Sequence, residues 1–280
     1  MLNKKQSTTQ LDWSVIIVNY RSRKYLKEAI ASLLQVERET KLSWEIIVVD
    51  NHSPKEESKK IKNDWRHEPR AQVIVSKNNL GFGGANNLGA QKAKGKYLFF
   101  LNPDTLCNEE LLEKLKTLLT RERCGVVAPK LMLPNNCPQL YSSGRFPTLG
   151  RTLSSKFLSK NDNHPTKTQA LRPVDWVSGA AMAMEKTLFE QIGGFDERFF
   201  MYFEDVDLCR RVATSGRQNY VAENLSVVHL GGERTVMTKA RREKYFAGQN
   251  QYFQKHRPQE YKWLRIIRRG YEWWCQKKDQ

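Results

Sequence analysis

The stretch that decides the fold is Trp13–Asn19 (WSVIIVN), an apolar, β-branched run that ends in a polar residue. Further runs of this kind follow at Glu45–Asp50, Gln72–Ser76, Lys96–Leu101 and Gly125–Pro129. Runs that are apolar on both faces are typical of parallel strands covered by helices on either side. The first 130 residues therefore predict an α/β half-domain built on a mainly parallel sheet.

Helical spacing of apolar residues separates these runs. Lys24–Gln35 carries leucine and isoleucine at intervals of three and four, and Asn108–Thr120 does the same with Asn108 as the expected N-cap. Residues 134–172 are rich in Pro, Asn, Ser and Gly, which predicts a long loop region. Beyond it we expect a helix at Glu204–Thr214 and a last strand at Val227–Leu230.

Composition excludes several classes of protein. The 280 residues carry 47 Lys and Arg against 30 Asp and Glu, a formal charge of +17, which favours anionic partners such as nucleic acid, nucleotides or an acidic membrane surface. No apolar run reaches the roughly 18 residues of a spanning helix, and no secretory signal is evident, so we expect a cytoplasmic protein. The five cysteines form no Cys-x-x-Cys pair, which argues against a zinc ribbon.

Polar side chains follow the ends of the predicted strands. Asn19 and Tyr20 close the first, Asp50 closes the second, and Asn102 and Asp104 follow the fourth. In open α/β sheets ligands bind beyond the carboxyl ends of the strands, so these side chains indicate a shared site. The alternative is that they serve only as turn residues.

Two further segments have both a structural and a functional interpretation. Asn79–Gly89 (NLGFGGANNLG) is a glycine-rich turn that suits either tight packing or close approach to a phosphate, but it lacks the G-x-G-x-x-G fingerprint of dinucleotide enzymes. Asp104 follows a buried strand, where a carboxylate holds Mg²⁺ or Mn²⁺ or else caps the next helix.

Acidic residues gather at the start of the Glu204–Thr214 helix. Glu204, Asp205 and Asp207 follow the aromatic run Phe199–Phe203. They stabilise the helix N-terminus, and a carboxylate beside aromatic walls is also a candidate general base. Asp205 and Asp207 lie on different helix faces and should have different roles. His229, late in the last strand, is either structural or a ligand for a metal or phosphate.

In order and spacing these segments resemble family 2 glycosyltransferases with the GT-A fold. The motifs that carry the resemblance are VIIVNYRS, VVDNHS, NNLGFGGANNLG, FLNPDT, VSGAAMAMEK, GGFDERFFMYFEDVDLCRR and VVHLGGERT. The NPDT and FEDVDLCRR forms are similar to those of bacterial rhamnosyltransferases that build cell-surface polysaccharides. The resemblance implies a GT-A domain over residues 1–235. It has a Rossmann-like nucleotide-sugar half at 1–130, a mixed, mainly parallel sheet and an acceptor and catalytic half at 173–235.

The resemblance also assigns roles by position. It implies that the nucleotide-sugar contacts Asn19, Tyr20, Asp50, Gly83, Asn87 and Asn102. Trp176 and Gly179 would border the acceptor or donor sugar. Asn102 stands where the D-x-D motif of the family more often has Asp, which removes one charge from the site.

For the chemistry, the resemblance implies that Asp205 is the general base with Glu204 as its neighbour, and that Asp104 and His229 hold Mg²⁺ or Mn²⁺. The reaction would be inverting transfer of a sugar from a nucleoside diphosphate-sugar, dTDP-rhamnose by preference, to a glycan or lipid-linked acceptor. Arg234 and closure of a Gly231–Thr235 loop would assist at the diphosphate.

The C-terminal segment, residues 236–280, is expected to be helical, basic and aromatic. Residues 234–280 carry 13 Lys and Arg against four acids, a net +9. Its aromatic and apolar residues recur at helical spacing, at Trp263, Ile267, Tyr271 and Trp274. Such a helix lies on an anionic membrane, packs on the catalytic domain or forms a dimer, and we expect a peripheral position on the inner face of the membrane.

Two alternatives remain from the residues alone. A nucleic-acid-binding protein would explain the charge, but no RRM, zinc-finger or helix-turn-helix signature is present, and we expect no nucleic-acid partner. A non-catalytic nucleotide-sugar-binding module would keep the fold, but the intact Asp104, Asp205 and His229 argue against it.

Overall fold

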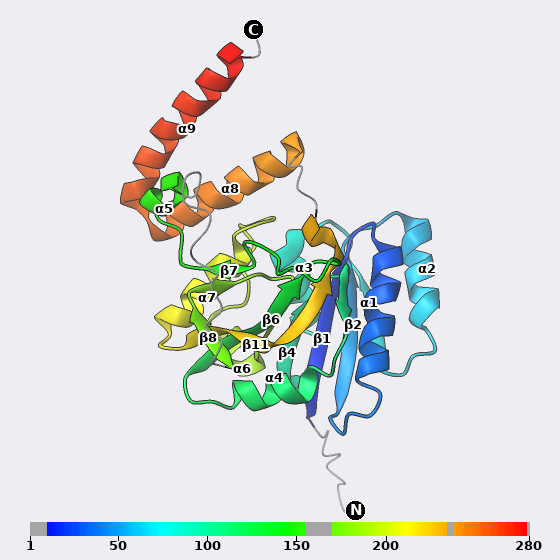
Figure 1. The fold of residues 1–280 in the computed structure, drawn as a ribbon. Coiled ribbons are helices and arrows are strands. Elements are labelled where there is room, and N and C mark those ends of the chain that lie inside the picture. Colours follow the sequence, from blue (N-terminus) through cyan, green and yellow to red (C-terminus); the bar gives the residue numbers. More distant parts are fainter. Residues whose placement is uncertain (1–9, 155–169, 234–237, 279–280) are drawn as a thin grey trace, which may run out of the picture.

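The computed structural model describes all residues except 1–9, 155–169, 234–237 and 279–280. Within that part of the chain, nine strands form one sheet in the order β3-β2-β1-β4-β10-β6-β11-β5, with β8 paired to β11 (Figure 1). The strands of this sheet are β1 (Leu11–Asn19), β2 (Trp44–Asp50), β3 (Ala71–Val75), β4 (Gly95–Leu101), β5 (Thr105–Cys107), β6 (Cys124–Met132), β8 (Leu171–Val174), β10 (Ala181–Glu185) and β11 (Gln218–His229). A separate ribbon pairs β7 (Ser143–Gly144) with β9 (Trp176–Val177).

Helices cover both faces of the sheet (Figure 1). They are α1 (Arg23–Val36), α2 (Lys55–Trp65), α3 (Gly81–Ala90), α4 (Leu112–Leu119), α5 (Leu149–Ser154), α6 (Lys186–Gln191), α7 (Glu204–Thr214), α8 (Lys239–His256) and α9 (Pro258–Lys278), with a 3₁₀ turn at Leu230–Glu233. None of the helices in the described part of the chain is long and apolar enough to cross a bilayer.

The side chains of β1 point alternately to the two faces of the sheet, and both faces are covered by helices. Val15 and Ile17 pack with buried side chains of α1, α2 and α4 on one face. Ile16 and Val18 pack with α3, α6 and α7 on the other. Because successive side chains of a strand point to opposite faces, a strand between two helix layers must be apolar throughout. This confirms the α/β prediction from the β-branched runs.

The sheet is mixed, mainly parallel, as expected. β3, β2, β1 and β4 run parallel, β6 and β11 are also parallel, and β10 is antiparallel to both β4 and β6. The bounds of most strands and helices differ from the expected ones by a few residues. The last strand, β11, begins at Gln218 and not at the expected Val227, and the expected loop region 134–172 contains β7, α5 and the start of β8. Because β1, β2 and β4 run parallel, their carboxyl ends meet at one edge of the sheet, the upper edge in Figure 1.

One local expectation, the start of a helix at Asn108, is wrong, and one of the two alternatives left open for Asp104 is excluded. The helix expected from Asn108 begins only at Leu112, and no side chain caps it from its own N-terminal residue. Instead Glu37, buried at the end of α1, accepts hydrogen bonds from the backbone N–H groups of Leu111 and Leu112 at 2.6 and 3.0 Å. Asp104 is not a helix cap, because the short strand β5 follows it.

A third apolar cluster joins the C-terminal helices to the rest of the molecule. Phe199, Phe203 and Val206 pack there with Tyr252 and Phe253 of α8, and Leu264 of α9 is also buried in it. Helix α8 consequently lies across the carboxyl edge of the sheet, and α9 projects away from it (Figure 1).

Candidate active site

The ends of β1 and β2 are joined by their polar side chains. Asn19 and Asp50 are in register and fully buried. Asn19 Nδ2 donates to Asp50 Oδ1 at 3.1 Å and to Ser53 Oγ at 3.2 Å, and Ser58 Oγ donates to the other Asp50 oxygen. Both side chains thus bind neighbouring protein groups. Tyr20, the next residue, is 42% exposed at the same edge, so it is the accessible one of these three residues.

The glycine-rich segment, expected as a turn, instead forms almost all of helix α3 and packs tightly against residues 195–200. Gly81 has φ +74°, and a Cβ atom there would collide with the carbonyl oxygen of Phe200. A Cβ on Gly83 would lie 2.9 Å from Phe195 Cβ. Asn87 fixes the same segment, because its amide donates to Phe195 O and accepts from Phe195 N, both at 2.9 Å. Gly83 and Asn87 therefore hold α3 against the segment that contains Phe195.

The structure brings Asp104 and His229 into contact. His229 Nε2 lies 3.2 Å from Asp104 Oδ1, and the two side chains are 11% and 25% exposed. Their meeting follows from the sheet, since β5 and β11 are antiparallel and place Thr105 opposite His229. On its other ring nitrogen, Nδ1, His229 contacts Gln139 Oε1 at 2.7 Å. No sequence motif pointed to Gln139, which lies in the loop-rich region.

This pair suits a divalent cation shared with a substrate. The described residues contain no cluster of three or more His, Cys, Asp or Glu side chains that could enclose a metal. Mg²⁺ is held in many enzymes by one or two carboxylates together with substrate phosphates and water. A Cβ on Gly231 would collide with Asp104 Oδ2, so the backbone passes directly over the carboxylate. One carboxylate, one imidazole and an adjacent glycine fit such an ion.

Glu204 and Asp205 begin α7 immediately after a strained backbone. Tyr202 and Phe203 have φ values of +69° and +70°, in the left-handed region that non-glycine residues seldom adopt. The turn aims Asp205 at Gly179, whose N–H donates to Asp205 Oδ2 at 2.9 Å. Non-glycine residues in this conformation are concentrated at functional sites.

Burial shifts the titration of this acidic pair. It raises the pKa of Asp205 above the ordinary 3.8, although hydrogen bonds from Gly179 and Val206 oppose the shift. Burial also raises the pKa of Glu204 well above 4.5, and the neighbouring Asp205 charge adds to it. Within the described residues, Glu204 Oε2 is buried without a hydrogen-bond partner. A carboxylate with a raised pKa is a better proton acceptor, which suits a general base.

Two adjacent backbone groups connect the acidic pair to the Asn102–Asp104 turn. The N–H of Asn102 donates to Ala180 O at 2.8 Å, and Gly179 N is held by Asp205. Gly179 has no room for a side chain, since a Cβ there would lie 2.9 Å from Phe82 Cε1. The Asn102–Asp104 turn and Asp205 thus contact neighbouring residues of one segment.

Trp176 lies farther along the same segment, in β9. Its indole N–H donates to Arg145 O at 3.1 Å, and its ring packs between two of the apolar clusters. Trp176 is therefore partly buried between these two clusters.

Asp207 faces away from Asp205, as expected. It is fully buried and binds Arg211 Nε at 2.8 Å and, from α8, Lys255 Nζ and His256 Nε2, both at 2.6 Å. Burial opposes ionisation, but the His256 hydrogen bond and the nearby Arg211 and Lys255 charges outweigh it and lower the pKa of Asp207. Asp207 anchors α8 to the helix that carries the acidic pair, a role that the sequence did not reveal.

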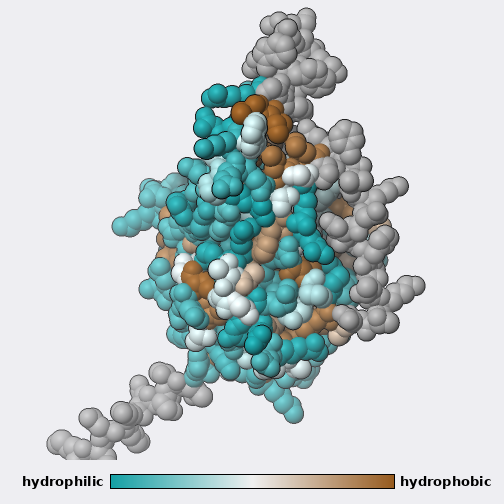
Figure 2. All heavy atoms as spheres, turned by 90° about the vertical axis from the view of Figure 1, so that its left-hand side faces the viewer, coloured by the Kyte–Doolittle hydropathy of each residue, from teal (hydrophilic) through white to brown (hydrophobic). Residues whose placement is uncertain are grey.

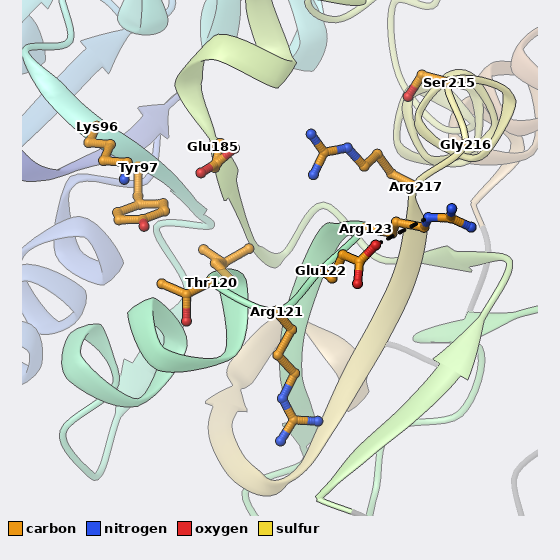
Figure 3. A pocket seen from close by; sticks show the side chains of 11 residues that line it. Lys96, Tyr97, Thr120, Arg121, Glu122, Arg123, Glu185, Ser215, Gly216 and Arg217 are labelled. Carbon is orange, nitrogen blue, oxygen red and sulfur yellow. Dashed lines mark ion pairs between the residues drawn. The ribbon is translucent and has the colours of Figure 1, made fainter.

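The surface also has a depression of about 750 Å³ that is remote from these residues (Figure 3). Lys96, Glu185 and Arg217 are among the residues that line it. It lies at the amino ends of β4 and β11, whereas the candidate site residues lie at the carboxyl ends of these strands. Figure 3 shows Glu122 paired with Arg123 at its rim. None of the expected site residues lines it, so it is separate from the candidate active site. A second depression, of about 510 Å³, is lined by residues 21–25 beside Tyr20.

Comparison with known proteins identifies the family. The model of glycosyl transferase family 2 matches residues 14–193. The low-salt glycan biosynthesis hexosyltransferase Agl10 of Haloferax volcanii is 31% identical over 212 residues, which are 74% of this chain and 64% of that protein. The N-acetylglucosaminyl-diphospho-decaprenol L-rhamnosyltransferase of Mycobacterium tuberculosis is 26% identical over 236 residues, 77% of this chain and 75% of that protein.

Solved structures agree on the fold. The crystal structure of GalNAc-T7 with UDP, GalNAc and Mn²⁺ superimposes with a TM-score of 0.62 at 17% identity, over 80% of this chain and 44% of that one. This chain thus spans less than two thirds of the length of Agl10 and of GalNAc-T7. From the matched residues and the shared architecture, the chain belongs to glycosyl transferase family 2 and has the GT-A fold.

Proposed function

We propose that the protein is an inverting glycosyltransferase that moves rhamnose from dTDP-rhamnose to a hydroxyl group of a glycan or lipid-linked acceptor. The observation that carries this proposal is the contact of Asp205 and of the Asn102–Asp104 turn with adjacent residues, Gly179 and Ala180. This arrangement supports a site in which a base and a diphosphate-binding turn act on one sugar. The rhamnosyltransferase among the relatives supports the choice of sugar.

In the proposed reaction Asp205 accepts the proton of the acceptor hydroxyl. The acceptor oxygen forms a bond to the anomeric carbon as the bond from that carbon to the diphosphate oxygen breaks, and the leaving nucleoside diphosphate keeps the electron pair. Attack from the face opposite the leaving group inverts the anomeric configuration. Gly179 N–H holds Asp205 Oδ2, which orients the carboxylate for this step.

Asp104 and His229 are the proposed ligands of Mg²⁺ or Mn²⁺. When bound, the cation neutralises the charge that develops on the diphosphate. Asn102, beside Asp104, supplies an amide where the family more often has a carboxylate, so the turn carries one negative charge fewer. Tyr20 is the proposed contact for the nucleoside because it is exposed at the edge where Asn19 and Asp50 are buried.

The proposed acceptor is linked to a lipid. The protein is proposed to act at the cytoplasmic face of an anionic membrane. One relative is named for a decaprenol-linked substrate. Helix α9 has an exposed apolar face, with Trp263 at 62%, Ile266 at 61% and Ile267 at 39% exposure. Figure 2 shows apolar side chains gathered on the upper part of the molecule, where α9 rises, with hydrophilic ones beside them.

Positive charge beside the apolar face of α9 supports a lipid bilayer as its binding partner. Lys262, Arg265 and Arg269 are exposed on the same helix, so the apolar face is bordered by cations. A basic amphipathic helix binds anionic lipid through buried apolar area together with electrostatic attraction. Leu264, on a neighbouring side of α9, is buried and fixes the helix to the protein.

A panel of nucleotide-sugars tests the donor assignment. The protein is incubated with dTDP-rhamnose and with UDP- and GDP-sugars, with and without Mn²⁺, and both donor hydrolysis and the melting temperature are measured. We expect dTDP-rhamnose with Mn²⁺ to stabilise the protein and to be hydrolysed fastest. Asp104→Ala should lose the Mn²⁺ dependence. Equal stabilisation by all donors would contradict the donor assignment, and tighter binding to DNA than to any donor would favour the nucleic-acid alternative.

A further inference from the structure

Gln139 lies in the loop-rich region, where the sequence indicates no function, yet it is firmly held. The backbone N–H of Gln139 donates to Leu131 O at 2.8 Å, and Leu133 N donates to Cys137 O at the same distance. Met132 and Pro138 form an isolated bridge between these two contacts. This tight turn continues β6 and delivers the Gln139 side chain to His229.

The contact between Gln139 and His229 favours one position for the proton of the imidazole ring. Gln139 Oε1 lies 2.7 Å from His229 Nδ1, and an amide oxygen can only accept a hydrogen bond. This contact favours a proton on Nδ1, and a neutral ring that is protonated there carries a lone pair on Nε2. Nε2 lies 3.2 Å from Asp104 Oδ1, and a lone pair on Nε2 beside this carboxylate oxygen favours a cation between the two atoms.

We propose that Gln139 is a positioning residue for the metal site: it holds His229 in the Nδ1–H tautomer, so that Nε2 is free to ligate a divalent cation together with Asp104. This rests on the proposed function. A histidine that ligates through one nitrogen usually donates from the other to an oxygen acceptor, and losing that acceptor weakens metal binding by 10- to 100-fold in well-studied sites. Gln139 supplies such an acceptor from a separate loop.

The direct test is Mn²⁺ binding to the full chain, followed by electron paramagnetic resonance in the presence of dTDP. Gln139→Leu removes the acceptor at similar size, and we expect its Kd for Mn²⁺ to rise by about 10- to 100-fold. Gln139→Glu keeps an oxygen at the same place and should retain most of the affinity. Leu140→Ala is the matched control, because Leu140 is the next residue and is 63% exposed.

A second measurement reads the tautomer in the metal-free protein. The ¹⁵N shifts of the imidazole of His229, assigned by comparison with His229→Gln, should show the Nδ1–H form in the wild type and a mixture of tautomers in Gln139→Leu. Melting temperatures of all variants establish that they are folded.

The outcomes separate this inference from the proposed function. If the wild type binds no Mn²⁺ with dTDP, both are overturned. If the wild type binds Mn²⁺ and Asp104→Ala does not, but Gln139→Leu binds it as tightly as the wild type, only the role of Gln139 is overturned. Weakened binding in Gln139→Leu together with retention in Gln139→Glu and Leu140→Ala supports the inference.

Discussion

Asp205 Oδ2 accepts a hydrogen bond of 2.9 Å from the backbone N–H of Gly179, one residue before the carbonyl that receives Asn102. The segment around Gly179 therefore connects two turns that are about 100 residues apart in the chain. Because Gly179 is pressed against the Phe82 ring, the connection has little freedom to shift. This relationship links the proposed base to the proposed diphosphate site, and the predictions below examine its parts.

Replacing the proposed base tests the chemistry. Asp205→Asn keeps the shape and can still accept the hydrogen bond from Gly179, but it cannot accept a proton. We expect the transfer rate to fall by about 10²- to 10⁴-fold while donor binding stays within a few-fold of the wild type. Steady-state kinetics and calorimetric titration with the nucleotide-sugar measure the two quantities. Wild-type turnover in this variant would contradict the assignment.

The raised pKa values of the acidic pair predict how activity varies with pH. Asp205 must be ionised to accept a proton, and burial raises its pKa above 3.8. Activity should therefore fall, as pH is lowered, with a midpoint above 3.8. The profile of kcat/KM against pH measures this midpoint in the free enzyme. A midpoint at or below 3.8 would contradict the burial argument.

The stability of the protein should also depend on ionisation of the acidic pair, but it should fall, and not rise, as the pH increases. A carboxyl group whose pKa is raised on folding stabilises the native state while protonated, and this stability is lost as pH rises through the raised value. Glu204→Gln removes a buried ionisable group, so we expect the variant to melt at a higher temperature than the wild type at pH 8, with a smaller difference at pH 5. An equal difference at both pH values would show that ionisation of Glu204 is not the cause.

Gly231→Ala tests the backbone that covers Asp104. A Cβ at residue 231 would overlap Asp104 Oδ2, so the carboxylate or the backbone over it must shift, which disturbs the pair with His229. We expect Mn²⁺ affinity to fall by at least 10-fold, on the order seen when the support of a metal ligand is lost. Gly150→Ala is the matched control, because a Cβ there meets no atom within 4 Å. Electron paramagnetic resonance with dTDP measures both variants, and equal affinities would contradict the prediction.

Lys255→Met tests the anchor between α8 and α7. Lys255 pairs with Asp207 at 2.6 Å and with Asp196 at 2.8 Å, and Asp207 is fully buried. Removing one partner leaves buried charge less compensated, and we expect the free energy of unfolding to fall by about 3 kcal/mol. Denaturant unfolding measures the change. Lys262→Met, on an exposed part of α9, should change stability by less than about 0.5 kcal/mol. Equal effects would contradict the anchor.

The exposed face of α9 gives a binding prediction. Replacing Trp263, Ile266 and Ile267 together by Ser removes the apolar side chains without touching the buried Leu264. We expect the triple variant to lose most of its affinity for vesicles that contain phosphatidylglycerol, measured by sedimentation, while its melting temperature is maintained. Wild-type protein should bind neutral phosphatidylcholine vesicles more weakly. Unchanged binding of the triple variant would contradict this role of α9.

Much of the fold was predictable because its signals are local. The β-branched run at Trp13–Asn19 predicts a strand buried on both faces, as do the runs that form β2 and β4. The predicted and observed bounds of these three strands agree to within a few residues. The Glu204–Thr214 helix was predicted with its observed bounds. By contrast, the start of α4 was misplaced, since its cap is supplied by Glu37, some 75 residues earlier.

The sequence by itself determined the layered α/β architecture and the side chains available for chemistry, because burial pattern and residue type are written along the chain. Only the tertiary structure decided which of them meet. Gln139 reaches His229 across 90 residues, Lys255 reaches Asp207 across 48, and neither pairing follows a local period. Such contacts depend on strand order and on how loops return to the sheet, and these are set by the packing of the whole chain.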